Sequence, residues 1–234
     1  MVERASEHAV TGKLLEVYGR LLGRYGPQHW WPAETPFEIM VGAVLTQATS
    51  WSNVEKAIAN LERACALTPG AIRALTPPEL ARLVYPSGFF NAKARKLAAL
   101  CLYLSRKHDD DIESMSRLDT AMLRDELLGV FGIGEETADA ILLYALGHPV
   151  FVIDAYSRRT FGRLGLANAF NSYTEHQSLF TRNLPLDAGM FGEYHALIVR
   201  HGRESCKKLP LCAACPLLEV CPAGQRQEGQ LAVL

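Results

Sequence analysis

Residues 127–140 read Leu-Leu-Gly-Val-Phe-Gly-Ile-Gly-Glu-Glu-Thr-Ala-Asp-Ala, which predicts two helices joined by a tight turn. One helix would end near Leu128 and the next would begin near Glu135, with Gly-Ile-Gly at 132–134 between them. Glycine permits a positive φ and a close approach of the backbone, and Ile133 can plug between the helices. The amides of such a turn, at a helix N-terminus, can bind a phosphate. Alone the motif is weak, because ordinary helix–helix turns share it.

Apolar residues on both sides of this turn recur at helical spacing. The stripes are Phe37-Met40-Val41-Val44-Leu45, Val54-Ala57-Ile58-Leu61, Leu97-Leu100-Cys101-Leu104 and Phe191-Tyr194-His195-Ile198-Val199. Thr76-Pro77 is a cap followed by proline at the first helical position. The run Phe151-Val152-Ile153 is the one short β-like segment. The sequence therefore predicts an all-α fold.

Composition excludes some classes of protein and leaves others open. The 234 residues are 49% hydrophobic and 21% charged, which excludes a disordered polyelectrolyte. Lys and Arg number 24 and Asp and Glu 25, so the total lacks the basic excess that is typical of DNA-binding proteins. The charges are nevertheless segregated, with nine acids and two bases in residues 109–136 and five bases in residues 91–108. Solvated helix faces are the simplest explanation of such runs.

The expected compartment follows from what the chain lacks. Residues 1–12 are polar and contain no apolar signal core, and no apolar stretch approaches the ~20 residues that a membrane span needs. We therefore expect a soluble cytoplasmic protein with no membrane partner. In a reducing compartment, clustered cysteines bind metal more often than they form disulfides.

Four of the six cysteines fall within sixteen residues, in the pattern Cys206-x5-Cys212-x2-Cys215-x5-Cys221. A zinc ribbon usually has two Cys-x2-Cys knuckles separated by a longer insert, whereas this loop has one such pair flanked by single cysteines. The compact loop suits a larger cubic iron–sulfur cluster with four Cys ligands. A zinc site is the alternative interpretation of these cysteines, and disulfides or a chance clustering are the third interpretation. Cys65 and Cys101 lie in apolar helical stripes and are predicted core residues.

Asp154 follows the apolar run at a predicted helix start. One interpretation is an N-cap, which alone would justify an aspartate there. The other is an anionic group beside the oxocarbenium-like sugar that forms when a glycosidic bond is cleaved. A helix N-terminus would keep this carboxylate ionised, which favours electrostatic stabilisation over general-base catalysis. The two interpretations are compatible, so both remain open.

These motifs together resemble the endonuclease III (HhH-GPD) superfamily of DNA glycosylases over roughly residues 27–222. Besides the hairpin, the aspartate and the cysteines, the matching segments are Gln47-Ala48-Thr49, Gly88-Phe89-Phe90-Asn91-x-Lys93 and His195-x5-His201-Gly202-Arg203. Each piece is unspecific, but the combination is highly specific.

The resemblance implies two all-α domains with DNA in a cleft between them. One would be a six-helix barrel over residues 27–147, with a helix-hairpin-helix at about 119–146. The other would combine residues 1–26 with 148–223 and hold a [4Fe-4S] cluster, and 224–234 would be a flexible tail. The expected partner is double-stranded DNA with a damaged base, bound by a monomer at the nucleoid.

Site residues carry over from the family motif position by position. Asp154 would be the catalytic aspartate, and Gln47 a candidate wedge into the gap left by the flipped base. The amides of Gly132 and Gly134, with Thr137, would bind the DNA backbone. The cluster ligands would be Cys206, Cys212, Cys215 and Cys221.

Glu136 departs from the family pattern. Bifunctional members have a lysine two residues after the second hairpin glycine, where it forms a Schiff base with the sugar, and this chain has Glu136 there. A carboxylate cannot form an imine. The sequence therefore predicts a monofunctional glycosylase with weak or absent AP lyase activity.

All three tryptophans, Trp30, Trp31 and Trp51, fall within 22 residues and form a candidate base pocket. Core packing is the better interpretation of any single Trp. An extruded base needs aromatic surfaces to stack on, and a cationic methylated purine gains roughly 0.5–2 kcal/mol from a Trp face. The motifs look most like the 3-methyladenine DNA glycosylase III subgroup, which implies an enzyme for alkylated purines. The alternatives are an endonuclease III-type glycosylase and lyase for oxidised pyrimidines, a non-catalytic iron–sulfur DNA-binding protein, and a structural zinc protein.

Overall fold

The computed structural model describes residues 2–168 and 170–231, with side chains for residues 8–168 and 170–227. All regular secondary structure within these residues is helical, which confirms the predicted all-α fold. The chain divides into two compact units. One is Trp31–His148, and the other combines Met1–Trp30 with Pro149–Leu234.

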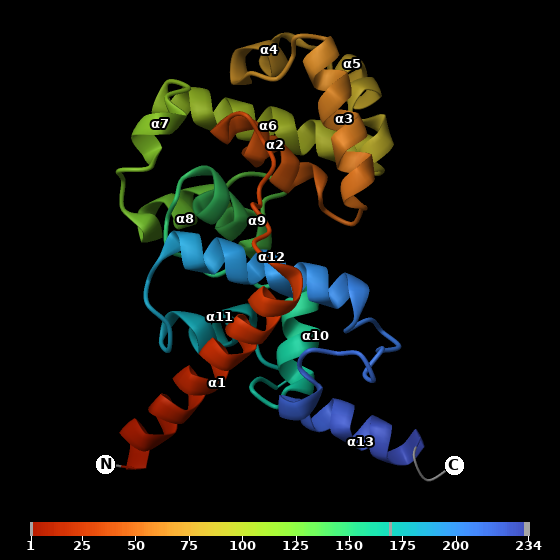
Figure 1. Ribbon diagram of the computed structural model, residues 1–234. Coiled ribbons are helices and arrows are strands. Elements are labelled where there is room, and N and C mark those ends of the chain that lie inside the picture. Colours follow the sequence, from red (N-terminus) through yellow and green to blue (C-terminus); the bar gives the residue numbers. More distant parts are fainter. Residues whose placement is uncertain (1, 169, 232–234) are drawn as a thin grey trace. The chain divides into compact units, whose positions relative to one another are not determined.

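The unit Trp31–His148 is built around two helices, α2 and α6 (Figure 1). Helix α2 contacts α3, α6 and α9, and α6 contacts α4, α5 and α7. Every residue of the three predicted stripes in this unit is buried, so those predictions are confirmed. The elements are α2 (Pro36–Leu45), α3 (Trp51–Arg63), α4 (Pro69–Ala74), α5 (Pro77–Leu83), η1 (Tyr85–Ser87), α6 (Phe90–His108), α7 (Ile112–Met115), α8 (Thr120–Leu128), α9 (Glu135–Ala140) and the π-helical η2 (Ile141–Ala145).

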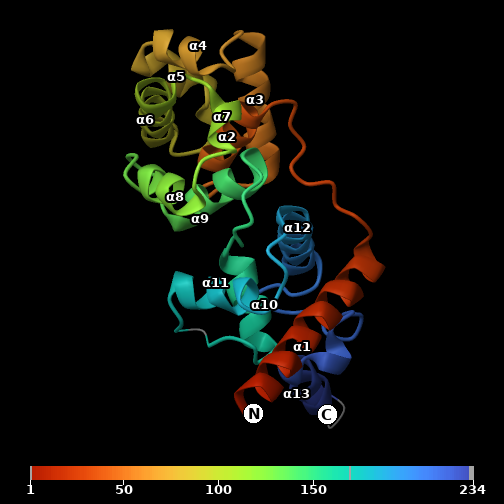
Figure 2. The same cartoon turned by 90° about the vertical axis from the view of Figure 1, so that its left-hand side faces the viewer.

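In the second unit, α12 packs against both α1 and α10, and the three can be followed in Figures 1 and 2. Aromatic rings fill its core: Phe151 stacks on Phe180 with centroids 3.7 Å apart, and Tyr194 meets both rings edge-on. The elements are α1 (Val2–Tyr25), α10 (Ala155–Arg163), α11 (Tyr173–Thr181), α12 (Ala188–Glu204), η3 (Leu218–Val220) and α13 (Pro222–Leu231).

Helix starts are fixed by side chains that satisfy the first free amides. The hydroxyl of Thr35 accepts a hydrogen bond from Glu38 N, and Pro36 opens α2. Thr76 and Glu79 form a capping box at the start of α5, which confirms the predicted cap. Each such cap stabilises its helix by roughly 1 kcal/mol, so the boundaries of these short helices are set locally.

Some details differ from the sequence predictions. Cys65 is exposed and has a φ of 50° just after α3, so its assignment to the core is wrong, whereas Cys101 is fully buried as predicted. Residues 151–153 are buried but belong to no strand, because no partner strand lies within the described part of the chain. Val199 is half-buried, unlike the rest of its stripe. These differences arise where tertiary packing overrides local periodicity.

The segment predicted as a flexible tail is helical as far as Leu231, the end of α13. Residues 232–234 lie outside the described residues. Among the described residues, no helix combines the length and apolar character that crossing a membrane would demand.

Candidate functional site

The Gly-Ile-Gly turn joins α8 to α9, and its first glycine is required on two counts. Gly132 has a φ of 81°, in the region that side chains disfavour. A Cβ at this position would also clash with Cγ of Lys96, because the lysine stem packs directly on the turn. Ile133 is only 5% exposed and fills the space between the helices, as the sequence predicted. The turn is therefore held in one conformation.

Gln47 lies beside the same turn. Its side-chain Nε2 donates to the carbonyl of Gly132 at 3.1 Å and to the hydroxyl of Thr137 at 2.9 Å. Its Oε1 accepts a hydrogen bond from the ammonium of Lys96. The structure thus brings three predicted DNA-binding residues together at one edge of the unit Trp31–His148.

Two cations from α6 flank this hairpin, although their charge run alone predicts a solvated helix face. Lys96 reaches Gln47, and the guanidinium of Arg95 lies 4.9 Å from the ring centroid of Phe131. Phe131 is 53% exposed and stands next to Gly132. The run of bases over residues 91–108, which contains no acid, was the one sign of these cations in the sequence. The sequence did not show that their side of the helix would lie against the turn.

A buried ion pair ties the two hairpin helices together. Arg124 of α8 binds Asp139 of α9 through two hydrogen bonds, of 2.7 and 3.2 Å, and Asp139 is completely buried. The guanidinium also lies 3.6 Å from Glu135. Removing one partner of a buried pair costs roughly 3–5 kcal/mol, so this contact stiffens the hairpin. Glu136 lies beside it in the first turn of α9.

Two of the three tryptophans meet. The ring of Trp31 is 5.3 Å from that of Trp51 and 5.4 Å from that of Tyr144, both edge-on. A Cβ on Gly42 would lie 2.9 Å from the Trp31 ring, so only glycine leaves room there. Trp30 belongs to the other unit and is half-buried. Tyr144 was missed because nothing in its local sequence distinguishes it from a core residue.

Asp154 caps α10, as one interpretation predicted. Its Oδ1 accepts hydrogen bonds from the amide of Ser157 at 2.7 Å and from the Ser157 hydroxyl at 2.9 Å. Its other oxygen, Oδ2, lies 3.7 Å from Nε2 of His195 on α12. Burial on its own would raise the pKa of Asp154, but His195 and Ser157 outweigh it and hold the pKa below its ordinary value. The carboxylate is therefore ionised at neutral pH although its side chain is only 12% exposed.

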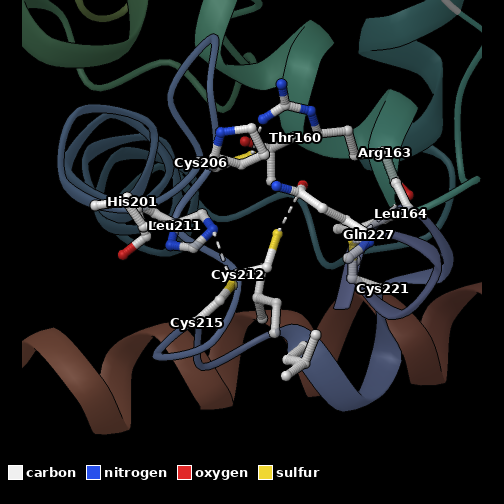
Figure 3. A pocket seen from close by; sticks show the side chains of 16 residues that line it. Thr160, Arg163, Leu164, His201, Cys206, Leu211, Cys212, Cys215, Cys221 and Gln227 are labelled. Carbon is white, nitrogen blue, oxygen red and sulfur yellow. Dashed lines mark hydrogen bonds between the residues drawn. The ribbon is translucent and has the colours of Figure 1, made fainter. Parts of the chain in front are cut away.

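The four clustered cysteines line one cavity of about 50 Å³, between α10, α12 and the loop that leads to α13 (Figure 3). Three of the sulfurs have a donor nearby. Arg163 Nη1 is 3.2 Å from the sulfur of Cys206, Gly224 N is 3.4 Å from that of Cys221, and His201 Nε2 is 3.9 Å from that of Cys215. Such donors stabilise thiolates, so the surroundings fit a metal-thiolate group.

His201 and Cys215 both respond to burial. Burial, with a smaller effect of Arg159, lowers the pKa of His201 to about 4, so its imidazole is neutral. The Tyr25 hydroxyl lies 3.1 Å from its Nδ1, and in the tautomer that carries its hydrogen on Nε2 the ring donates toward the sulfur of Cys215. Burial raises the pKa of Cys215, so this thiol must lose a proton before it ligates metal. Within the described residues, no three His, Cys, Asp or Glu side chains are grouped as a single metal ion would require.

Comparison with known proteins gives the family. Residues 41–185 match the model of the HhH-GPD superfamily base excision DNA repair proteins. The chain belongs to this superfamily. A protein of Methanocaldococcus jannaschii, named as a DNA repair glycosylase, is 45% identical over 210 residues, which is 89% of this chain and 95% of that protein. The chain is accordingly a base excision repair DNA glycosylase.

Two solved structures resemble the fold of this glycosylase. An endonuclease III in a non-covalent complex with DNA gives a TM-score of 0.81 at 24% identity, covering 94% of this chain and 98% of that one. The 3-methyladenine DNA glycosylase (MagIII) of H. pylori, bound to 1,N6-ethenoadenine, gives 0.70 at 30% identity, covering 85% and 97%. The predicted family and two-domain fold are confirmed.

Proposed function

We propose that this glycosylase is monofunctional and releases alkylated purines, such as 3-methyladenine, from double-stranded DNA. The observation that supports this most directly is Glu136, in the first turn of α9, where a lyase needs an amine. Without an amine at this position the sugar cannot be captured as an imine. The bond must then be broken by hydrolysis, with water as the acceptor.

Asp154 would supply the charge for this hydrolysis. As the bond between C1′ and the base nitrogen breaks, its electron pair leaves with the base and positive charge develops on the sugar. An ionised carboxylate fixed nearby stabilises that charge without reorganisation. Asp154 is fixed by its cap and ionised by its neighbours. An alkylated purine is already cationic, so it leaves without strong acid assistance.

The aromatic group of Trp31, Trp51 and Tyr144 supports the choice of substrate. Stacking on such rings holds an extruded base, and a cationic base gains a further 0.5–2 kcal/mol, roughly, over a neutral one. The sequence also predicted Trp30 for this pocket, and that stays a prediction. The 3-methyladenine DNA glycosylase (MagIII) of H. pylori is bound to 1,N6-ethenoadenine, which is also a modified adenine.

DNA would be held by the hairpin. Backbone amides at Gly132 and Gly134, with Thr137, would bind phosphate and position the duplex without reading sequence. Gln47 would enter the gap left by the extruded base, and its contacts with Gly132 and Thr137 place it beside those amides. We propose that a monomer does this.

We further propose that Cys206, Cys212, Cys215 and Cys221 hold a [4Fe-4S] cluster. The four sulfurs line one cavity with donors from Arg163, His201 and Gly224. A bound cluster would cross-link the loop 206–221 at four points and so stabilise this unit. Iron and acid-labile sulfide in anaerobically purified protein, near four of each per chain, would support this. One zinc per chain and no iron would refute it.

Substrate choice is tested by measuring base release from duplex DNA that contains 3-methyladenine, an oxidised pyrimidine or a mismatch. We expect release of the alkylated purine and no adduct when the reaction is quenched with borohydride. A trapped adduct with preference for oxidised pyrimidines would establish the endonuclease III-type alternative instead. DNA binding without release of any base would establish a non-catalytic protein.

A further inference from the structure

The two oxygens of Asp154 have different neighbours. Oδ1 accepts both hydrogen bonds from Ser157 and so caps α10. Oδ2 takes no part in the cap and lies 3.7 Å from Nε2 of His195. The cap and a catalytic role, which the sequence could not separate, therefore use different atoms. Oδ2 is the oxygen that remains for the sugar.

His195 stands in a stripe of α12 whose other members, apart from the half-buried Val199, are core residues. Its helical neighbours Phe191, Tyr194 and Ile198 are fully buried, and the imidazole side chain is itself only 10% exposed. A polar ring in such a place destabilises the fold unless it has a polar partner. Packing alone would be served better by an apolar residue, so the contact with Asp154 gives this histidine a reason to be there.

We infer that His195 is a positioning residue of the glycosylase reaction, holding Oδ2 of Asp154 in place and keeping it negative. This rests on the proposed role of Asp154 in hydrolysis. The separation of 3.7 Å is longer than a hydrogen bond, so the interaction is electrostatic. Catalytic contacts of this kind often shorten when substrate binds.

The need for such a partner follows from burial. A carboxylate removed from water tends to take up a proton, and a neutral carboxyl group cannot stabilise a sugar cation. Ser157 engages Oδ1, whereas His195 lies against Oδ2, and both help to lower the pKa of Asp154. Other charged groups of the two helices have contacts elsewhere: Arg158 with Asn171 O, Arg159 with Gly202 O and Cys206 O, Arg163 with Lys207 O, Glu193 with Gln28 N, and Arg200 with Glu204.

The test compares His195→Leu and His195→Gln with wild type in the full-length holoenzyme. Three quantities are measured: the single-turnover rate of 3-methyladenine release, the Kd for duplex DNA, and the titration midpoint of the 13C-labelled Asp154 carboxyl. His195→Leu should slow release about tenfold or more, equivalent to one pKa unit of lost stabilisation, and raise the midpoint. The Kd should stay within about twofold. His195→Gln, which keeps a donor, should recover part of both effects.

His176→Gln is the matched control. His176 is another fully buried histidine of the same unit, bound to Ser172 O and Arg158 and not to Asp154. It should leave the Asp154 midpoint unchanged. The inference is overturned if folded His195→Leu keeps the wild-type midpoint, or releases base at the wild-type rate. If wild type itself releases no base, the proposed function fails, but the carboxyl titration still decides whether His195 acts on Asp154.

Discussion

Lys93 offers a quantitative prediction about the end of α2 that precedes Gln47. Its side chain is buried inside the unit Trp31–His148, and its ammonium donates to the carbonyls of Leu45 at 2.8 Å and Ser87 at 2.6 Å. Burial, with a smaller effect of Lys96, lowers the pKa of Lys93 from 10.5 to about 8. The contact joins the last residue of α2 to the start of α6.

The sign of the pH effect follows from this shift. Because the pKa of Lys93 is lower in the folded chain, the unfolded chain binds more protons above pH 8, and stability rises with pH there. Between pH 7 and pH 9 the Lys93 ammonium loses its proton in most folded chains but keeps it in the unfolded chain. The resulting gain in the free energy of unfolding is about 1.4 kcal/mol.

Urea denaturation of wild type and Lys93→Met, at pH 7, 8 and 9, measures this gain. Burial raises the pKa of Cys101 to about 12, so this thiol opposes stability near pH 9, but it does so equally in both proteins. The difference in unfolding free energy between wild type and variant should therefore shift by about 1.4 kcal/mol in favour of wild type. A difference that stays constant or shifts the other way would refute the reasoning.

Three further predictions concern the hairpin. Gly132→Ala should weaken duplex binding at least tenfold and lower stability by about 1–3 kcal/mol, because its Cβ meets Lys96 and its φ is positive; wild-type binding and melting would contradict this. Glu136→Lys should create a borohydride-trapped adduct on DNA that wild type does not form, and continued absence of the adduct would show that the position alone does not determine lyase chemistry. The variants Arg95→Gln and Lys96→Gln should each reduce the steepness of log K for duplex binding against log salt concentration by about 0.9. Slopes equal to that of the exposed control Lys56→Gln would show that neither cation contacts the DNA phosphates.

Helical periodicity was sufficient to predict the fold. The stripes at residues 37–45, 54–61 and 97–104 form buried faces because a 3.6-residue repeat places them on one side of a helix. The cap at Thr76-Pro77 was also local and was confirmed. Cys65 was misassigned because it follows the end of α3, where helical periodicity no longer applies.

Tertiary contacts at the site were less predictable. The resemblance implied a DNA-binding role for Gln47, Gly132 and Thr137, but it implied neither their contact with one another nor the position of Lys96 over the turn. The Lys96 contact joins residues far apart in sequence, and no local pattern encodes it. His195 was visible only as one member of an apolar stripe, and its approach to Asp154 depends on how α12 packs against α10.

Base release by Asp154→Asn tests the central claim most directly. Asparagine keeps the cap, because its side-chain oxygen accepts the bonds from Ser157 and it ranks with aspartate as an N-cap. The charge is lost, and an amide nitrogen takes the place of Oδ2. We predict that wild type releases 3-methyladenine from duplex DNA and that a folded, DNA-binding Asp154→Asn is slower by about 10²–10³-fold in single turnover. Release at the wild-type rate by this variant would contradict the account.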